Sequence, residues 1–180
     1  MRSLRIVLAT GLTLLIAGCV VSSLHPLFTE KDLAFDPSFL GTWAGMDEDD
    51  TLVFQAGEGK AYDLAYVTEG QTLKFKVHLV QLGELQFFDV YPKVSKEHDA
   101  FHLIPAHTIW RVQKDGDLLR TAWLDQGWLE EKTAKRKIRI PHQTVEDRLI
   151  LTASTEELQK FVLKYADDAF SDFNEFQLQK

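Results

Sequence analysis

The sequence predicts a mainly β protein in which about eight antiparallel strands follow one another as a meander and close into a barrel. A C-terminal amphipathic helix and a smaller inserted helix complete the prediction. Residues 73–79 place apolar side chains at every second position, which is typical of a strand with one dry and one wet face. Turn residues such as Gly83-Glu84 and Asp115-Gly116 separate such segments. Twelve Phe, four Trp and four Tyr supply large apolar side chains for the enclosed face.

The chain begins with the pattern of a signal peptide. Arg2 and Arg5 precede an apolar stretch over 6–16, and small residues follow it. Because a membrane-spanning helix needs roughly 20 apolar residues, this stretch is too short to remain as a permanent span. We expect residues 1–18 to be removed.

The first residue after the signal peptide is the chain's single cysteine, Cys19. Ile16-Ala17-Gly18-Cys19 resembles the lipobox of bacterial lipoproteins. The resemblance implies cleavage before Cys19, a diacylglycerol on its sulfur, and a fatty acid such as palmitate on its amino group. Two or three acyl chains anchor a protein stably in a membrane. Val20, where a retention signal would be Asp, implies the outer membrane, with the domain facing the periplasm. The alternative is an ordinary signal peptide followed by a buried free thiol.

Residues 19–35 are predicted as the lipidated cysteine and a tether, which leaves 36–180 as one domain. Sixteen extended residues reach at most roughly 55 Å, so such a tether would let the domain stand away from the membrane. Asp36-Pro37-Ser38 then predicts a short helical turn, with a capping acceptor and proline at the first helical position.

Eight strands are expected after this turn. Closure of about eight strands removes exposed edges and gives an interior that is filled by side chains or holds one small ligand. The expected strands lie at 40–45, 50–56, 60–68, 72–82, 85–91, 101–114, 117–124 and 147–153. The side chains expected to line the interior are Phe54, Tyr62, Leu64, Tyr66, Phe75, Val77 and Phe87.

Two helices interrupt the strand pattern. Residues 154–157 read Ser-Thr-Glu-Glu, which is a capping box. Leu158, Phe161, Val162 and Tyr165 follow at helical spacing and predict a helix that packs on the barrel wall. The smaller helix is expected near 126–136.

A short turn followed by Gly41-Thr42-Trp43 and a meander of eight strands resembles the lipocalin architecture. The resemblance implies that Gly41 and Trp43 lie on the first strand, that Trp43 closes one end of the barrel, and that Arg148 packs over its ring. The turn at 114–117 departs from that family's second motif. Separately, the start of the chain is similar to the openings of uncharacterised bacterial lipoproteins, through "LHPLFTEKDLAFDP" followed by "LGTW". This similarity implies no activity.

Three groups of polar residues are candidates for chemistry. His98, His102 and His107 could ligate a metal, but a strand would place His107 on the opposite face, so a hydrogen-bonded histidine is the favoured interpretation. The acidic run at 47–50 could hold calcium, yet it lacks the glycine and the distant glutamate of a known calcium loop. Glu146-Asp147 would point to opposite faces of a strand, and no other catalytic motif is present. We therefore expect neither an enzyme nor a cofactor.

The remaining candidate is a basic cluster on and after the smaller helix. Its members are Lys132, Lys135, Arg136, Lys137 and Arg139, and Trp128 lies beside them. This cluster could contact anionic lipid headgroups or an acidic partner, or it could be a solvated helix face. The formal net charge of −7 argues against a nucleic-acid partner. Two functions stay open: a lipid-anchored carrier of a small apolar ligand, or an interaction subunit of an envelope complex with a filled barrel.

Overall fold

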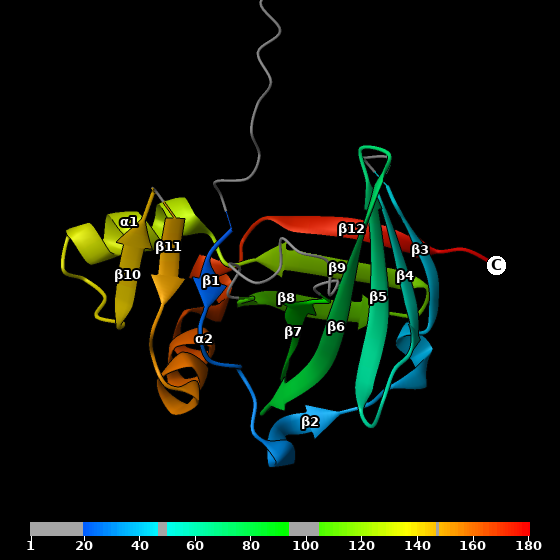
Figure 1. The fold of residues 1–180 in the computed structure, drawn as a ribbon, viewed down its shortest axis with the longest axis horizontal. Helices are drawn as coiled ribbons and strands as arrows, with labels where there is room; N and C mark the ends of the chain where they lie inside the picture. Colours follow the sequence, from blue (N-terminus) through cyan, green and yellow to red (C-terminus); the bar gives the residue numbers. More distant parts are fainter. Residues whose placement is uncertain (1–19, 47–49, 94–104, 147) are drawn as a thin grey trace, which may run out of the picture.

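The computed structural model describes residues 20–46, 50–93, 105–146 and 148–180. In these ranges eight strands form a closed antiparallel barrel (Figure 1). Each pairs with the next in the order β8-β7-β6-β5-β4-β3-β12-β9, and β9 pairs back with β8. The mainly β fold class and the closed barrel are therefore confirmed. The barrel strands are β3 (Gly41–Gly45), β4 (Thr51–Ala56), β5 (Ala61–Thr68), β6 (Gln71–Leu82), β7 (Leu85–Pro92), β8 (His107–Asp115), β9 (Leu118–Trp123) and β12 (Phe173–Leu178).

The strand that completes the barrel differs from the expected one. The segment at 147–153 contains β11 (Arg148–Leu151), but β11 lies outside the barrel, where it pairs antiparallel with β10 (His142–Val145). β11 also runs parallel to β1 (Ser22–Ser23), which joins this small extension to β8. The eighth barrel strand is β12, which follows the C-terminal helix and pairs with β3 and β9 on its two edges.

The prediction of a tether over 20–35 is wrong, because this segment packs against the barrel. Val21 is 3% exposed and Leu27 is fully buried. A short 3₁₀ helix, η2 (Glu30–Asp32), and β2 (Leu33–Ala34) follow, and β2 pairs with β6. A second 3₁₀ turn, η3 (Pro37–Phe39), then leads into β3, as the sequence predicts. We call residues 20–35 the N-terminal strap.

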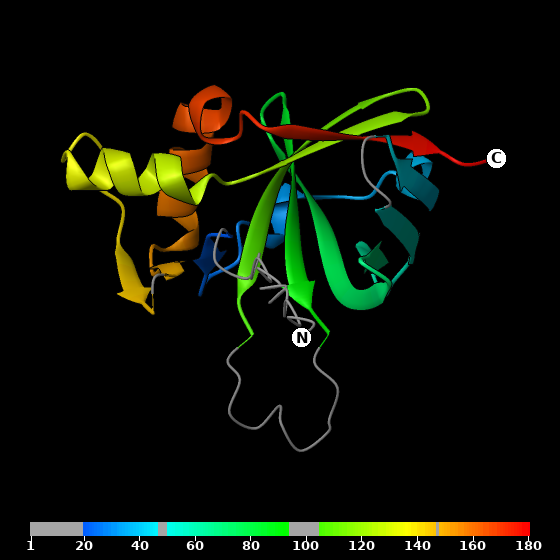
Figure 2. The same ribbon diagram turned by 90° about the horizontal axis from the view of Figure 1, so that it is seen from above.

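Both helices form where they are expected. α1 (Gln126–Ala134) is capped by Asp125, and α2 (Thr155–Ala169) begins with the predicted capping box between Ser154 and Glu157. In α2 the stripe that includes Leu158 and Val162 is buried against the barrel wall. Seen from above, α1, α2, β10 and β11 gather on one side of the barrel (Figure 2).

The apolar side chains form two cores separated by the barrel wall. The interior core, inside the barrel, includes Trp43, Tyr62 and Phe88. The wall core lies between the outer face of the barrel and α1, α2 and β11, and it includes Phe87 and Leu158. Strands of the shared wall are therefore apolar on both faces, as buried sheets are.

Candidate functional site

Large apolar side chains lie buried inside the barrel. Phe54, Tyr62 and Phe88 are all at most 2% exposed, and their rings pack at centroid distances of 5.3 Å for Phe54–Phe88 and 6.0 Å for Phe54–Tyr62. Tyr62 is held further by its hydroxyl, which donates to the carbonyl of Asp36 at 3.0 Å, and burial raises the pKa of this hydroxyl to about 12. Rings in contact at these distances take up space that a ligand would otherwise occupy.

The predicted lining residues lie in this interior core with one exception. Phe54, Tyr62, Leu64 and Val77 are buried members of the core, and Tyr66 and Phe75 pack against it. Phe87 is the exception: it faces outward into the wall core, where its ring lies 5.7 Å from that of Phe170. Its neighbour Phe88 faces inward instead, because successive strand residues point to opposite faces.

Trp43 of β3 lies in the interior core. Its indole Nε1 donates to the carbonyl of Phe39 at 2.8 Å, and the side chain is fully buried. The cation near its ring is Lys114 of β8, whose Nζ lies 6.0 Å from the ring of Trp43 and 5.9 Å from that of Phe39. The expectation for Arg148 is wrong, because this exposed residue lies on β11, outside the barrel.

Gly41 is required at the start of β3. Its φ is +130°, and an added Cβ would lie 3.0 Å from the Leu178 side chain of the neighbouring β12. A larger residue would therefore be strained in the backbone and crowded against β12.

The predicted basic cluster divides into two parts. Trp128 is half-buried against α2, with its ring 5.6 Å from that of Tyr165. Lys135 pairs with Glu131 at 2.9 Å, and Lys132 Nζ lies 6.0 Å from the Trp128 ring. These three side chains are thus engaged within the α1 and α2 region.

The second part continues onto α2. The connection from α1 to β10 crosses beside α2, and two adjoining hollows of about 610 and 380 Å³ share its residues 138–141. We name this site the basic groove. Its cations are Arg136, Lys137, Arg139, Lys160 and Lys164, and its apolar residues are Ile138, Ile140, Pro141, Phe161 and Tyr165.

The cations of the basic groove are only partly neutralised. Lys160 pairs with Glu156 at 2.7 Å. Within the described part of the chain, no ion pair neutralises Arg136, Lys137 or Arg139. The one lining carboxylate, Glu157, accepts hydrogen bonds from the backbone and hydroxyl of Ser154, which lower its pKa.

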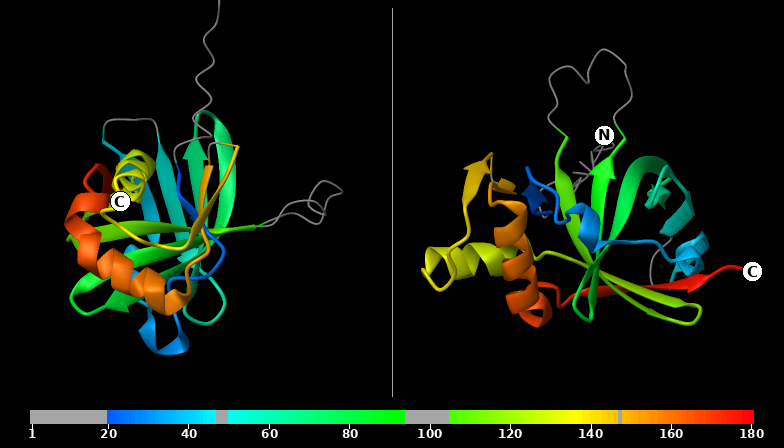
Figure 3. Two further views of the ribbon diagram at one scale, coloured as in Figure 1. Left: turned by 90° about the vertical axis from the view of Figure 1, so that its left-hand side faces the viewer. Right: turned by 90° about the horizontal axis from the view of Figure 1, so that it is seen from below.

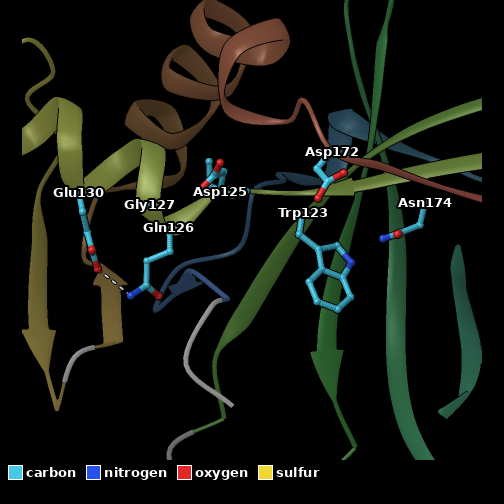
Figure 4. A pocket seen from close by; sticks show the side chains of 8 residues that line it. Trp123, Asp125, Gln126, Gly127, Glu130, Asp172 and Asn174 are labelled. Atoms are coloured by element: carbon cyan, nitrogen blue, oxygen red, sulfur yellow. Dashed lines mark hydrogen bonds between the residues drawn. The ribbon is translucent and has the colours of Figure 1, made fainter. Parts of the chain in front are cut away.

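A separate hollow of about 510 Å³ lies between the N-terminal end of α1 and Trp123 (Figure 4). Asp125 Oδ1 accepts from the backbone N–H of Trp128 at 2.9 Å, and Glu130 accepts from Gln126 Nε2 at 2.7 Å. These two carboxylates therefore accept hydrogen bonds from α1, and we assign no ligand to this hollow.

A polar cluster that the sequence analysis did not find lies beneath the N-terminal strap. The carboxylate of Asp89 is fully buried, lies 2.7 Å from His107 Nδ1 and accepts from the Leu27 backbone N–H at 2.8 Å. His78 is the cross-strand neighbour of Asp89, and burial lowers its pKa. The cluster fastens the strap to the barrel wall, which explains why β7 carries a buried carboxyl group.

Several predicted residues lie outside the described ranges, namely Cys19, His98, His102, Asp147 and the acidic residues 47–49. Among the residues that are described, no group of three or more His, Cys, Asp or Glu side chains is arranged to hold a metal ion. None of the helices in those same ranges has the length and apolar character to cross a membrane.

The class defined by this architecture is a closed, eight-stranded antiparallel barrel, consistent with a lipocalin-like fold. No protein-family model, no curated protein and no solved structure matches the chain.

Proposed function

We propose that this protein is a lipid-anchored bacterial envelope lipoprotein, without enzymatic activity, whose filled barrel serves as a rigid module that binds another protein of the envelope. The observation that supports this choice over a ligand carrier is the packing of Phe54, Tyr62 and Phe88 inside the barrel. Binding energy then has to come from the outer surface, where the basic groove combines cations with apolar side chains.

The anchor in this proposal is Cys19, as the Ile16-Ala17-Gly18-Cys19 motif implies. The proposed site is the periplasmic face of the outer membrane, since Val20 follows the cysteine. Mass spectrometry of the tryptic peptide from Cys19 to Lys31 tests the anchor directly. The proposal expects a diacylglyceryl group and an N-acyl group on Cys19, and no acylation when Cys19→Ser is expressed. An unmodified thiol would remove the anchor from the proposal.

Native mass spectrometry of the full chain in detergent tests the filled barrel. We expect the mass of the acylated polypeptide alone, and no small molecule after denaturation. Phe54→Ala is the matched control, because loss of a buried ring leaves an apolar cavity of the kind that binds benzene. Benzene should raise the melting temperature of this variant and leave that of the wild type unchanged. A stoichiometric lipid released from the wild type would instead make the protein a carrier.

A further inference from the structure

We propose that the basic groove binds an acidic, amphipathic segment of a partner protein. This inference rests on the proposed function as an interaction module and adds the chemistry of the partner. Three observations support it: the apolar residues that line the groove, the cations that have no ion pair, and the position of the groove on the molecule.

The apolar side of the groove comes from an alternating segment. Ile138 and Ile140 are each 6% exposed and point into the wall core, while the intervening Arg139 is exposed. Phe161 and Tyr165 of α2 continue the apolar lining, with their ring centroids 5.4 Å apart. A partner segment can therefore place apolar side chains over Pro141, which is exposed, and Tyr165, which is partly exposed, and acidic side chains beside the cations.

The basic groove is lined by cations, although the chain as a whole has a negative net charge. The chain carries a formal net charge of −7, whereas Arg136, Lys137 and Arg139 lie together without an ion pair in the described ranges. An acidic segment is attracted to this site, whereas the net charge of the molecule as a whole repels it. Such a contrast steers a partner to one site and gives specificity.

The position of the groove favours a polypeptide over lipid headgroups. The connection between α1 and β10 lies on the flank of the molecule beside α2, whereas β1 begins at the upper end (Figures 1 and 3). The proposed anchor at Cys19 lies three residues before β1 and one before the bridge of Val20 to Asp125, so a bilayer would meet that end. The flank then remains open to a partner in the periplasm.

The test uses the acylated full chain in detergent and a fluorescent peptide of about ten residues that alternates Glu with Leu. Fluorescence anisotropy measures Kd. We expect Arg139→Glu to weaken binding about tenfold, since reversal removes an attraction and adds a repulsion. Lys74→Glu on the outer face of β6 is the matched control and should leave Kd within about twofold. Binding should also weaken at high ionic strength.

Two further probes separate the alternatives. A peptide with Gly in place of Leu should bind more weakly, and equal affinity would overturn the apolar contact. Vesicles of phosphatidylglycerol and phosphatidylcholine are mixed with the Cys19→Ser chain, which has no acyl anchor, and its binding should show no dependence on Arg139. Vesicle binding that Arg139→Glu abolishes, together with no peptide binding, would overturn the inference in favour of a membrane contact. These outcomes are independent of the acylation and filled-barrel experiments, so failure here leaves the proposed function intact.

Discussion

At the scale of single residues, the best-defined polar contacts are those beneath the N-terminal strap. Asp89 is a buried acceptor for two donors from different parts of the chain, the Leu27 backbone and His107. The strap is held from its other side by Gln159 of α2, whose Nε2 donates to the Leu27 carbonyl at 2.8 Å. Both backbone polar groups of Leu27 are therefore satisfied although the residue is buried.

Asp89→Ala should lower the free energy of unfolding by about 3 kcal/mol, because it leaves the Leu27 N–H and the His107 ring without their buried acceptor. Urea unfolding measures the change. Asp63→Ala is the control, since Asp63 forms a pair with Lys93 in which both side chains are more than 40% exposed. Its cost should be at most about 1 kcal/mol. Similar costs for the two variants would show that the strap is not fastened by Asp89.

A second prediction concerns the pH dependence contributed by His78. Burial is the largest cause of its lowered pKa, opposed by Asp89 and Glu30 and assisted by Lys76 and His107. Its Nδ1 has no hydrogen-bond partner in the described ranges. As the pH falls below about 6.5, the unfolded chain binds a proton at this ring before the folded one does, so stability is lost.

His78→Phe should remove this loss and keep a ring beside Phe28, whose centroid lies 4.5 Å from that of His78. The variant should gain stability relative to the wild type when the pH is lowered from about 8 to about 5.5. Chemical denaturation at both pH values measures the difference. A difference that does not change with pH would contradict a lowered pKa for His78.

At the scale of elements, the end of α1 shows how backbone and charge combine in the basic groove. Arg136 has a φ of +55°, and the hydrogen bonds Arg136 N–H to Thr133 and Lys137 N–H to Lys132 form a Schellman motif. This position favours glycine, since a side chain in the left-handed region costs about 1 kcal/mol. An arginine here supplies a groove cation at some cost in stability.

Arg136→Gly should therefore raise the free energy of unfolding by about 1 kcal/mol. It should also raise the Kd of the acidic peptide about threefold. Thermal unfolding and fluorescence anisotropy measure the two effects. Glu69→Gly is matched, because Glu69 also has a positive φ, of 49°, but lies in the turn between β5 and β6. Glu69→Gly should stabilise the fold and leave the Kd of the acidic peptide unchanged. A loss of stability in Arg136→Gly would refute the cost assigned to Arg136.

The strands also show what the sequence could and could not predict. Period-two alternation locates most of the barrel strands, because each strand has one face in the interior core. The same alternation marks 173–178, where Phe176 and Leu178 alternate with polar residues. Whether β11 or β12 closes the barrel depends on pairing with β3 and β9, far away in sequence, and no local pattern carries that information.

The candidate site was predictable to a similar extent. The cations at 132–139 form a visible run, but Lys160 and Lys164 join them only because α2 packs beside the connection from α1. The prediction for Phe87 names the wrong face, because β7 is apolar on both sides and its residues show no alternation.

At the scale of the whole molecule, the wall shared by the two cores couples the barrel to the helices and the strap. Neighbouring wall residues such as Phe87 and Phe88 are both fully buried, one in each core. The strap then covers part of the wall core with Val21 and Leu27. Because Val21 already packs in the wall core, a lipid anchor at Cys19 would have no flexible spacer.

The last prediction follows from this lack of a spacer. Val20 bridges to Asp125, and Ser22 and Ser23 pair with β8 and β11, so acylation of Cys19 would place the lipid one residue from the fold. One residue spans at most about 3.6 Å. β1 begins at the same end of the molecule as the turn between β10 and β11 (Figures 1 and 3). This end should therefore rest on the bilayer.

Fluorophores on introduced cysteines can measure this orientation, because the only native thiol would be acylated. In vesicles with quencher-labelled headgroups, a fluorophore at Val145→Cys beside the β10–β11 turn should be quenched strongly. One at Glu84→Cys, in the turn between β6 and β7 at the opposite end, should be quenched little. About ten Gly and Ser residues inserted after Cys19 add a reach of roughly 17 Å and should reduce the contrast. Equal quenching without the insertion would mean that the strap detaches and acts as a tether after all.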